Sequence, residues 1–127
     1  MKAWGIEKKQ YLCNVNEVAV MEKTQILNKI KQVASQVLPK GSSLYLYGSR
    51  ARGEDHENSD WDLLLLLDKA EVGKDDFTKY SYPIMIAGFD LWQLFSIQTY
   101  TKSQWQNGPH SMYYYNVEED KQLLYES

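Results

Sequence analysis

The clearest pattern of apolar positions lies between residues 22 and 38. Apolar side chains recur there at gaps of three and four residues: Ile26, Leu27, Ile30, Val33, Ala34 and Val37. This spacing places them on one face of a helix, with mainly lysine and glutamine on the opposite face. Pro39 disfavours helical geometry at the residue before it, and Gly41 supplies a turn. The pattern predicts an amphipathic helix over residues 22–38.

Two strand patterns follow this helix. Residues 43–47 alternate, with leucines on one side and tyrosines on the other, and they lead directly into Gly48. Residues 61–67 contain an unbroken run of leucines, which is typical of a strand buried on both faces. The sequence therefore predicts a short strand followed by a central strand of the sheet.

The second half of the chain is less regular. Residues 83–91 fit either a helix or a strand, whereas residues 94–100 have the composition of a strand. A short helix is predicted at 102–106 and a last strand at 122–125. These elements favour an α/β (α+β) fold of two layers, with a small mixed, mainly antiparallel sheet and helices on one face.

The length of 127 residues suits one domain, which at this size buries roughly two thirds of the surface of the unfolded chain. Residues 1–20 show no clear periodicity, and we expect a loosely docked N-terminal extension there. An alternative translation start at Met21 would fit the same pattern. A single folded domain is then expected over residues 21–127.

Charge and cysteine content limit the environment and the partners. The net charge of −3 indicates no broad basic face, so nucleic acid is not expected as a general partner. Cys13 is the only cysteine, which favours a reducing compartment. The longest strictly apolar run, residues 63–67, is far too short to span a membrane. We therefore expect a cytoplasmic protein, and a homo-oligomer remains open.

The segment after the first predicted strand carries the first candidate for chemistry. Gly48 allows the backbone to turn tightly and to approach a ligand, and the Ser49 hydroxyl can add a hydrogen bond. A helix beginning just beyond this turn would present free amide groups to a phosphate. Arg50 and Arg52 are further candidates for contacts with phosphate.

Asp60 and Asp62 provide the second candidate. They stand two residues apart at the start of the leucine-rich strand, so they point to the same face, about 6.6–6.8 Å apart along the strand. Two short carboxylates at this spacing can reach a shared cation. Oxygen ligands of this kind suit magnesium, which retains waters and phosphate oxygens.

One familiar phosphate-binding motif is excluded. Gly48 and Gly53 match the first part of a P-loop, but Glu54 and Asp55 stand where that motif requires lysine and serine or threonine. A P-loop NTPase is therefore not predicted.

The combination of these residues resembles a known family. Gly48-Ser49, ten intervening residues and Asp60-Trp61-Asp62 are similar to the signature of the minimal nucleotidyltransferases of the DNA polymerase beta-like superfamily. Further similarity lies in the flanking residues and in the C-terminal part: Arg50-Ala51-Arg52-Gly53, Ser59, Tyr113-Tyr114-Tyr115-Asn116 and Leu123-Leu124-Tyr125-Glu126. The core motif covers about a fifth of the chain.

The resemblance implies roles for individual residues. Gly48 and Ser49 would hold the triphosphate, and Asp60 and Asp62 would hold two magnesium ions, for which manganese could substitute. The family adds a third carboxylate from a later strand, and Asp90 is the chosen candidate. If residues 83–91 form a helix instead, Asp90 becomes a surface charge. The next strand then offers only three polar candidates: Gln93, Ser96 and Gln98.

The resemblance also implies an activity and a partner. A metal-dependent nucleotidyltransferase would transfer a nucleoside monophosphate from a nucleoside triphosphate, with ATP as the expected donor, to an unidentified acceptor. Small members of this family resemble partners of all-helical HEPN proteins in toxin–antitoxin pairs. Two alternatives remain: a catalytically weak nucleotide-binding module that neutralises a partner by binding alone, and a transferase that modifies antibiotics or sugars.

Overall fold

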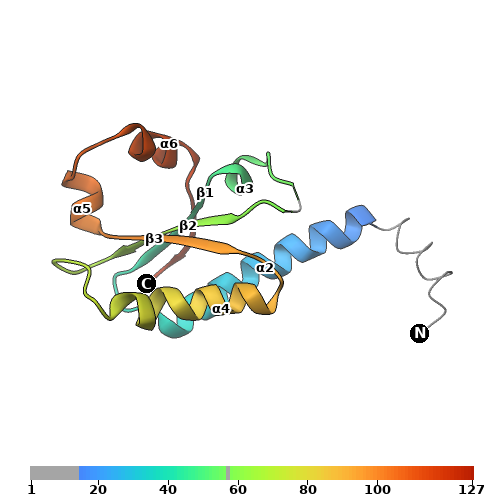
Figure 1. Ribbon diagram of the computed structural model, residues 1–127, viewed down its shortest axis with the longest axis horizontal. Helices are drawn as coiled ribbons and strands as arrows, with labels where there is room; N and C mark the ends of the chain where they lie inside the picture. The colour runs from blue at the N-terminus through green and yellow to red at the C-terminus, as the bar shows by residue number, and fades with distance from the viewer. Residues whose placement is uncertain (1–14, 57) are drawn as a thin grey trace.

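The computed structural model describes residues 15–56 and 58–127, and side chains are described from Lys23 onward except at residue 57. Most of the expected N-terminal extension, residues 1–14, lies outside the described part. The helical segments are α2 (Val15–Val37), α3 (Ser49–Arg52), the π-helical turn η1 (Phe77–Ser81), α4 (Tyr82–Asp90), α5 (Lys102–Asn107) and α6 (Met112–Asp120). The strands are β1 (Ser43–Tyr47), β2 (Trp61–Leu67), β3 (Phe95–Thr101) and β4 (Gln122–Glu126). Figure 1 shows their arrangement.

The four strands form one mixed sheet in the order β3-β2-β1-β4. β1 pairs antiparallel with both β2 and β4, and β2 pairs parallel with β3. The parallel pair is connected through η1 and α4, as a parallel connection requires a crossover. The structure thus confirms the predicted mixed, mainly antiparallel sheet.

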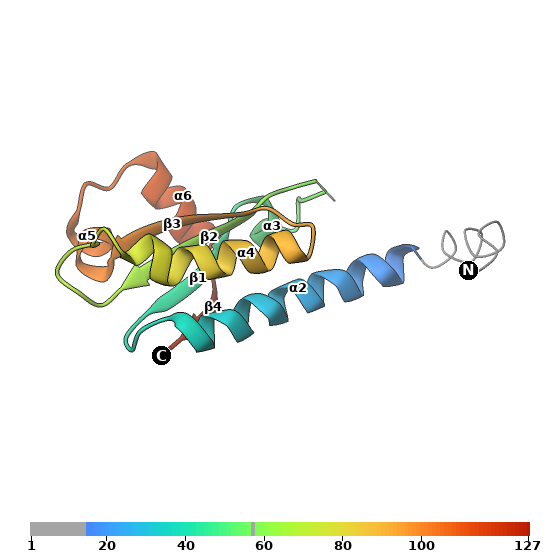
Figure 2. The same cartoon turned by 60° about the horizontal axis from the view of Figure 1, so that its bottom comes forward.

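The long helices α2 and α4 pack side by side against one face of the sheet (Figure 2). Alternate residues of β2 point toward them, and Trp61, Leu63, Leu65 and Leu67 are buried there with the apolar face of α2. Gly88 of α4 lies so close to Phe95 of β3 that an added Cβ would stand 2.8 Å from its ring. This close packing forms the main core.

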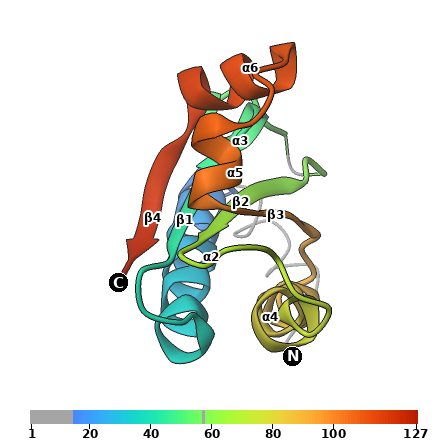
Figure 3. The ribbon, with the colours of Figure 1, turned by 90° about the vertical axis from the view of Figure 1, so that its left-hand side faces the viewer.

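The shorter helices α5 and α6 lie on the opposite face of the sheet, whereas α3 directly follows the end of β1 (Figure 3). Leu64 and Leu66 of β2 point to this side and pack beneath Trp105 of α5 and Val117 of α6. The leucine run is therefore buried on both faces, as predicted for a central strand. The expectation that helices cover only one face holds for the long helices, but it missed this second set.

Several boundaries differ from the sequence prediction. The helix predicted over residues 22–38 begins at Val15 instead, so the expected boundary at residue 20 falls inside α2. Residues 83–91, which fitted either state, lie in α4 up to Asp90. The helix α6 was not predicted, because its tyrosine-rich start has no apolar period of its own. No helix of the described residues has the length and apolar character needed to cross a membrane.

Candidate active site

A tight turn between β1 and α3 forms the first half of the site. Gly48 has φ 79° and ψ −158°, a combination that is essentially restricted to glycine. The backbone amides of Ala51 and Arg52 donate to its carbonyl oxygen at 3.0 and 3.1 Å, which starts the short helix directly after the strand. Gly53 ends that helix with a left-handed conformation at φ 75°. A helix does therefore begin just beyond the glycine turn, which was the condition for the suggested phosphate contact.

The acidic pair meets this turn across the β1–β2 pairing. Asp62 stands opposite Tyr47, the last residue of β1, so its side chain lies beside Gly48. A Cβ added to Gly48 would collide with Oδ2 of Asp62 and would stand 3.3 Å from its Cγ. The glycine thus leaves the space that the carboxylate occupies. Two motifs separated by ten residues in sequence form one site.

The electrostatics of Asp62 suit a site for a cation. Burial raises the pKa of its carboxyl above the ordinary value, and the neighbouring charge of Asp60 raises the pKa further. The charge of Arg52 acts in the opposite direction. Asp60 itself is exposed, just before the first residue of β2. Two carboxylates that repel each other gain from a positive charge between them.

The structure does not bring Asp90 to this pair. Asp90 is the last residue of α4 and is exposed, so its assignment to a strand as the third ligand is wrong. Among the described residues, no group of three acidic, histidine or cysteine side chains is placed to hold a metal ion. The alternative prediction, that Asp90 becomes a surface charge if its segment is helical, agrees with the structure.

The polar candidates that followed Asp90 occupy different places. Gln93 accepts a hydrogen bond from Nε1 of Trp61 at 2.8 Å, on the side of the main core. Ser96 pairs with Asp62 in the parallel register of β2 and β3, and therefore shares its face of the sheet. Gln98 is two residues further along the same face and is exposed. The position beside Asp62 on the neighbouring strand is thus held by a serine.

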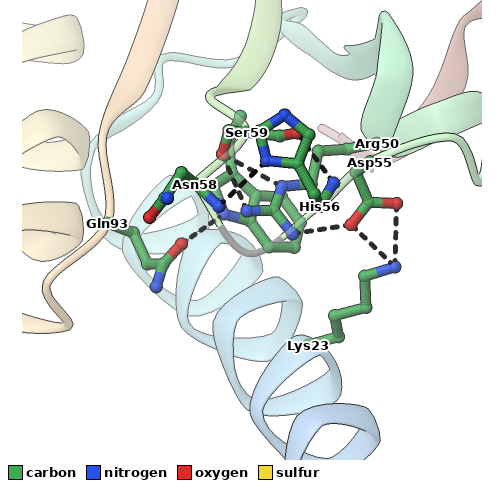
Figure 4. Close-up of polar contacts among 8 residues, drawn as sticks. Lys23, Arg50, Asp55, His56, Asn58, Ser59 and Gln93 are labelled. Carbon is green, nitrogen blue, oxygen red and sulfur yellow. Dashed lines mark hydrogen bonds and ion pairs between the residues drawn. The ribbon is translucent and has the colours of Figure 1, made fainter.

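Arg50 is held inside the protein rather than presented to a ligand (Figure 4). Only 5% of its side chain is exposed; Nη1 lies 2.7 Å from Oδ2 of Asp55, and Nε and Nη2 donate to the Ser59 carbonyl at 3.2 and 2.7 Å. Its guanidinium also lies 4.4 Å from the ring centre of Trp61. Lys23 of α2 reaches the same Asp55 carboxylate at 3.0 Å. These contacts occupy the guanidinium group of Arg50 and fix the loop that precedes Asp60. They do not support the predicted contact between Arg50 and a phosphate.

Arg52 remains closer to the expected role. Its side chain is 43% exposed and lies between Glu54 at 2.8 Å and Asp120 of α6 at 2.6 Å. Its charge acts on Asp62, which places it within electrostatic reach of the acidic pair. The contact with Asp120 also joins α3 to α6. Arg52 can therefore offer a positive charge beside the carboxylates.

Two tyrosines that were not among the predicted site residues lie beside the site. The hydroxyl groups of Tyr47 in β1 and Tyr113 in α6 form a hydrogen bond of 3.0 Å. Burial raises the pKa of Tyr47, and the charge of Asp62 acts in the same direction. Burial and the contact with Tyr47 also raise the pKa of Tyr113. The adjacency of Tyr47 to Gly48 was visible in sequence, but the contact with Tyr113 depends on the unpredicted helix α6.

The arrangement fits a magnesium ion bound together with a phosphate. Magnesium usually takes only one or two carboxylates from a protein and completes its shell with water and substrate oxygens. Asp60 and Asp62 supply such a pair beside the glycine turn. Glycine at the turn also permits a backbone conformation that can approach a ligand closely.

Fold and site together define a nucleotidyltransferase domain, and comparison with known families agrees. The family described as polymerase beta nucleotidyltransferase matches residues 28–126, so the chain belongs to this family. The sequence-based resemblance and the expected enzyme class, a nucleotidyltransferase, are thereby confirmed.

Solved structures show the same fold at low sequence identity. A chain in a toxin–antitoxin structure with AMP-PNP has a TM-score of 0.57 and 19% identity, covering 80% of this chain and 73% of that chain. A candidate nucleotidyltransferase from Sulfolobus solfataricus has a TM-score of 0.51 and 19% identity, covering 85% and 86%. A comparison with curated proteins found no match.

Proposed function

We propose that the chain binds a nucleoside triphosphate with magnesium and transfers its nucleoside monophosphate to an acceptor. In this proposal Gly48 and Ser49 hold the triphosphate, and Asp60 and Asp62 hold the metal. The packing of Gly48 against Asp62 carries the proposal, because it joins the phosphate turn and the acidic pair in one place. Bound metal would neutralise charge on the reacting phosphate and on the leaving pyrophosphate.

The protein's own groups contribute mainly position and charge. The glycine turn fixes the triphosphate, and Arg52 adds a positive charge within reach of Asp62. Arg50 keeps the loop from Asp55 to Ser59 in place, and this loop leads into Asp60. Transfer of a nucleotidyl group depends largely on such positioning and on charge stabilisation.

One observation supports a second candidate function. The third carboxylate has no counterpart beside Asp62, where Ser96 occupies the neighbouring position on β3. A serine cannot take a proton from an acceptor hydroxyl as a carboxylate can, and it is a weaker ligand for a second ion. Binding of the nucleotide without efficient transfer is therefore the alternative: a module that neutralises a partner by contact.

We propose ATP as the donor nucleotide and a protein as the partner. The similar toxin–antitoxin structure was obtained with AMP-PNP, which supports an adenine nucleotide and an assembly with another chain. An all-helical HEPN toxin would be the corresponding partner here, with this chain as antitoxin. The first candidate function predicts transfer of the nucleotidyl group, for example to that partner. The second predicts contact with the partner without transfer.

The test follows the transferred group. Purified protein is incubated with magnesium and ATP labelled at the α-phosphate, with and without a lysate of its source cells. Asp60→Ala removes one carboxylate of the site. Asp90→Ala removes an exposed carboxylate outside the site and is the matched control.

The two candidate functions predict different outcomes. Label on a protein, RNA or small molecule that is lost with Asp60→Ala and kept with Asp90→Ala supports transfer and identifies the class of acceptor. Magnesium-dependent ATP binding without any labelled product supports the binding module. Labelling that persists in the Asp60→Ala protein contradicts the assignment of the site.

A further inference from the structure

A cavity of about 450 Å³ lies on the same face of the sheet as Asp62. Its walls come from β3, from α5, from the loop before α6 and from α6 itself, and Val72 of the loop after β2 lies at its border. Aromatic side chains dominate the lining: Tyr100, Trp105, Tyr113 and Tyr114. A concave site of this size, lined mainly by apolar and aromatic groups, is typical of small-molecule binding.

The aromatic rings of the cavity form a continuous set. Tyr100 and Tyr114 lie 5.2 and 4.9 Å from Trp105, measured between ring centres. Tyr113 packs edge-on against Trp105 at 6.1 Å. Trp105 is also held by Glu118, which accepts a hydrogen bond from its indole nitrogen at 2.5 Å. Trp105 is only 5% exposed, and His110 stacks on Tyr114 with ring centres 3.8 Å apart, so neighbouring rings hold one another in place.

Tyr113 connects this cavity to the acidic site. It lines the cavity, and its hydroxyl is hydrogen-bonded to that of Tyr47, the residue opposite Asp62. The strand register gives the distance along the sheet between the acidic site and the cavity. Asp62 and Leu66 lie on one face of β2, and Leu66 pairs with Tyr100. Four residues of strand span about 13 Å, comparable to the length of a nucleoside monophosphate.

We propose that this cavity binds the nucleobase of the donor nucleotide, while its phosphates lie at the glycine turn and the acidic pair. The inference rests on the proposed function and names the subsite that would hold the base. A flat base can pack against the partly exposed rings of Tyr100 and Tyr113, because aromatic rings offer their faces to any base. Stacking of this kind tolerates different bases, so the cavity provides affinity rather than strict base selection.

The cavity suits the donor better than a macromolecular acceptor. Tyr113 lines the cavity and contacts Tyr47 next to Gly48, so a molecule of nucleotide length can reach from the cavity to the acidic site. An acceptor protein would instead require a surface on which its backbone can rest. The cavity is partly open and, at about 450 Å³, offers room for a planar group.

The test compares two ligands that differ by the nucleoside. Inorganic tripolyphosphate carries only the phosphate chain, whereas α,β-methylene-ATP adds the sugar and base and resists cleavage at the reacting bond. Val72→Trp places a large ring at the border of the cavity, and Val72 lies in a loop and is 37% exposed. Lys74→Trp adds the same ring to an exposed site in that loop outside the cavity lining and is the matched control.

Calorimetry with magnesium gives the expected result as a pattern. Val72→Trp weakens binding of α,β-methylene-ATP about tenfold and leaves tripolyphosphate binding unchanged, while Lys74→Trp changes neither. Tyr113→Ala weakens nucleotide binding, and Tyr113→Phe, which keeps the ring, restores most of it. If Val72→Trp leaves the affinity for the nucleotide unchanged, the proposal is overturned. This holds even if the variant raises the KM for an acceptor.

Failure of the proposed function gives a different pattern. If the wild-type protein binds neither tripolyphosphate nor the nucleotide analogue, the phosphate and metal site is wrong. Adenosine alone then tests the cavity. Adenosine binding that is lost in Val72→Trp supports a base-binding cavity, and absence of adenosine binding overturns it.

Discussion

Gly48 and Asp62 are in direct contact, and the carboxylate of Asp62 fills the space where a Cβ on residue 48 would stand. The contact arises because Asp62 pairs with Tyr47 across two antiparallel strands, and Gly48 follows immediately. It fixes the phosphate turn relative to the acidic pair. The following predictions test this arrangement and the residues around it.

Gly48→Ala should disturb both stability and binding. Alanine at this backbone conformation costs about 1–3 kcal/mol, and its Cβ would push Asp62 out of place. We expect magnesium-dependent nucleotide affinity to fall more than about tenfold, measured by calorimetry. Gly53→Ala is the matched control, because Gly53 also has positive φ but no atom within 4 Å of an added Cβ. Equal losses of affinity in both variants would contradict the role of the Gly48–Asp62 contact.

Arg50→Gln should destabilise the fold. The Arg50 side chain is buried against Asp55 and Ser59, and removal of one partner of a buried ion pair costs about 3 kcal/mol. Urea unfolding measures this loss. Arg52→Gln removes a half-exposed arginine from the same short helix and should cost clearly less, because exposed ion pairs contribute little to stability. If Arg52→Gln lowered the free energy of unfolding more than Arg50→Gln, Arg50 would not hold the loop.

The Asp55 carboxylate should make stability depend on pH in the acid range. Burial opposes its ionisation, but the hydrogen bond from Lys23, its backbone hydrogen bond and the charge of Arg50 lower its pKa below the ordinary value of 3.8. The folded state therefore binds this proton less tightly than the unfolded state. Its contribution is present above pH 3.8 and is lost as the pH falls through the lowered pKa.

Unfolding of the wild type and of Asp55→Asn, measured by urea between pH 3 and pH 7, checks this dependence. The difference in free energy of unfolding between the two proteins should be constant near neutral pH and should shrink below pH 3.8. A difference that persists unchanged at pH 3 would exclude Asp55 as the titrating group.

Asp90→Asn should leave nucleotide binding and turnover at the wild-type level. Asp90 is exposed at the end of α4 and takes no part in the acidic site. Binding calorimetry and the rate of label transfer measure both properties. A tenfold decrease in rate with unchanged binding would return Asp90 to the role of third ligand, and α4 would then have to unwind at its end.

The site could be predicted as far as its local motifs extend. Gly48-Ser49 and Asp60 with Asp62 are each defined by a few neighbouring residues, and the strands around them have clear patterns. The predicted bounds 43–47 and 61–67 agree with β1 and β2. The third ligand depended on whether residues 83–91 form a helix or a strand, and apolar composition alone does not decide between the two.

Other features required the pairing of distant segments. Ser96 becomes the neighbour of Asp62 only through the register between β2 and β3. The role of Arg50 depends on Asp55, Ser59 and Lys23, the last of which is contributed by α2. Long-range contacts of this kind leave no periodic signal in the sequence. The position of Arg50 next to a glycine turn therefore suggested phosphate binding. In the structure its side chain is buried and holds the loop before Asp60.

Magnesium-dependent binding of α,β-methylene-ATP to the wild type and to Asp62→Asn tests the central claim most directly. The raised pKa of Asp62 means that its ionised form costs stability at neutral pH when no cation is present, so asparagine should not destabilise the fold. Unfolding of the same samples checks this. The proposed site predicts a stable Asp62→Asn protein that has lost magnesium-dependent binding. Retention of wild-type affinity with magnesium in this variant would contradict the site.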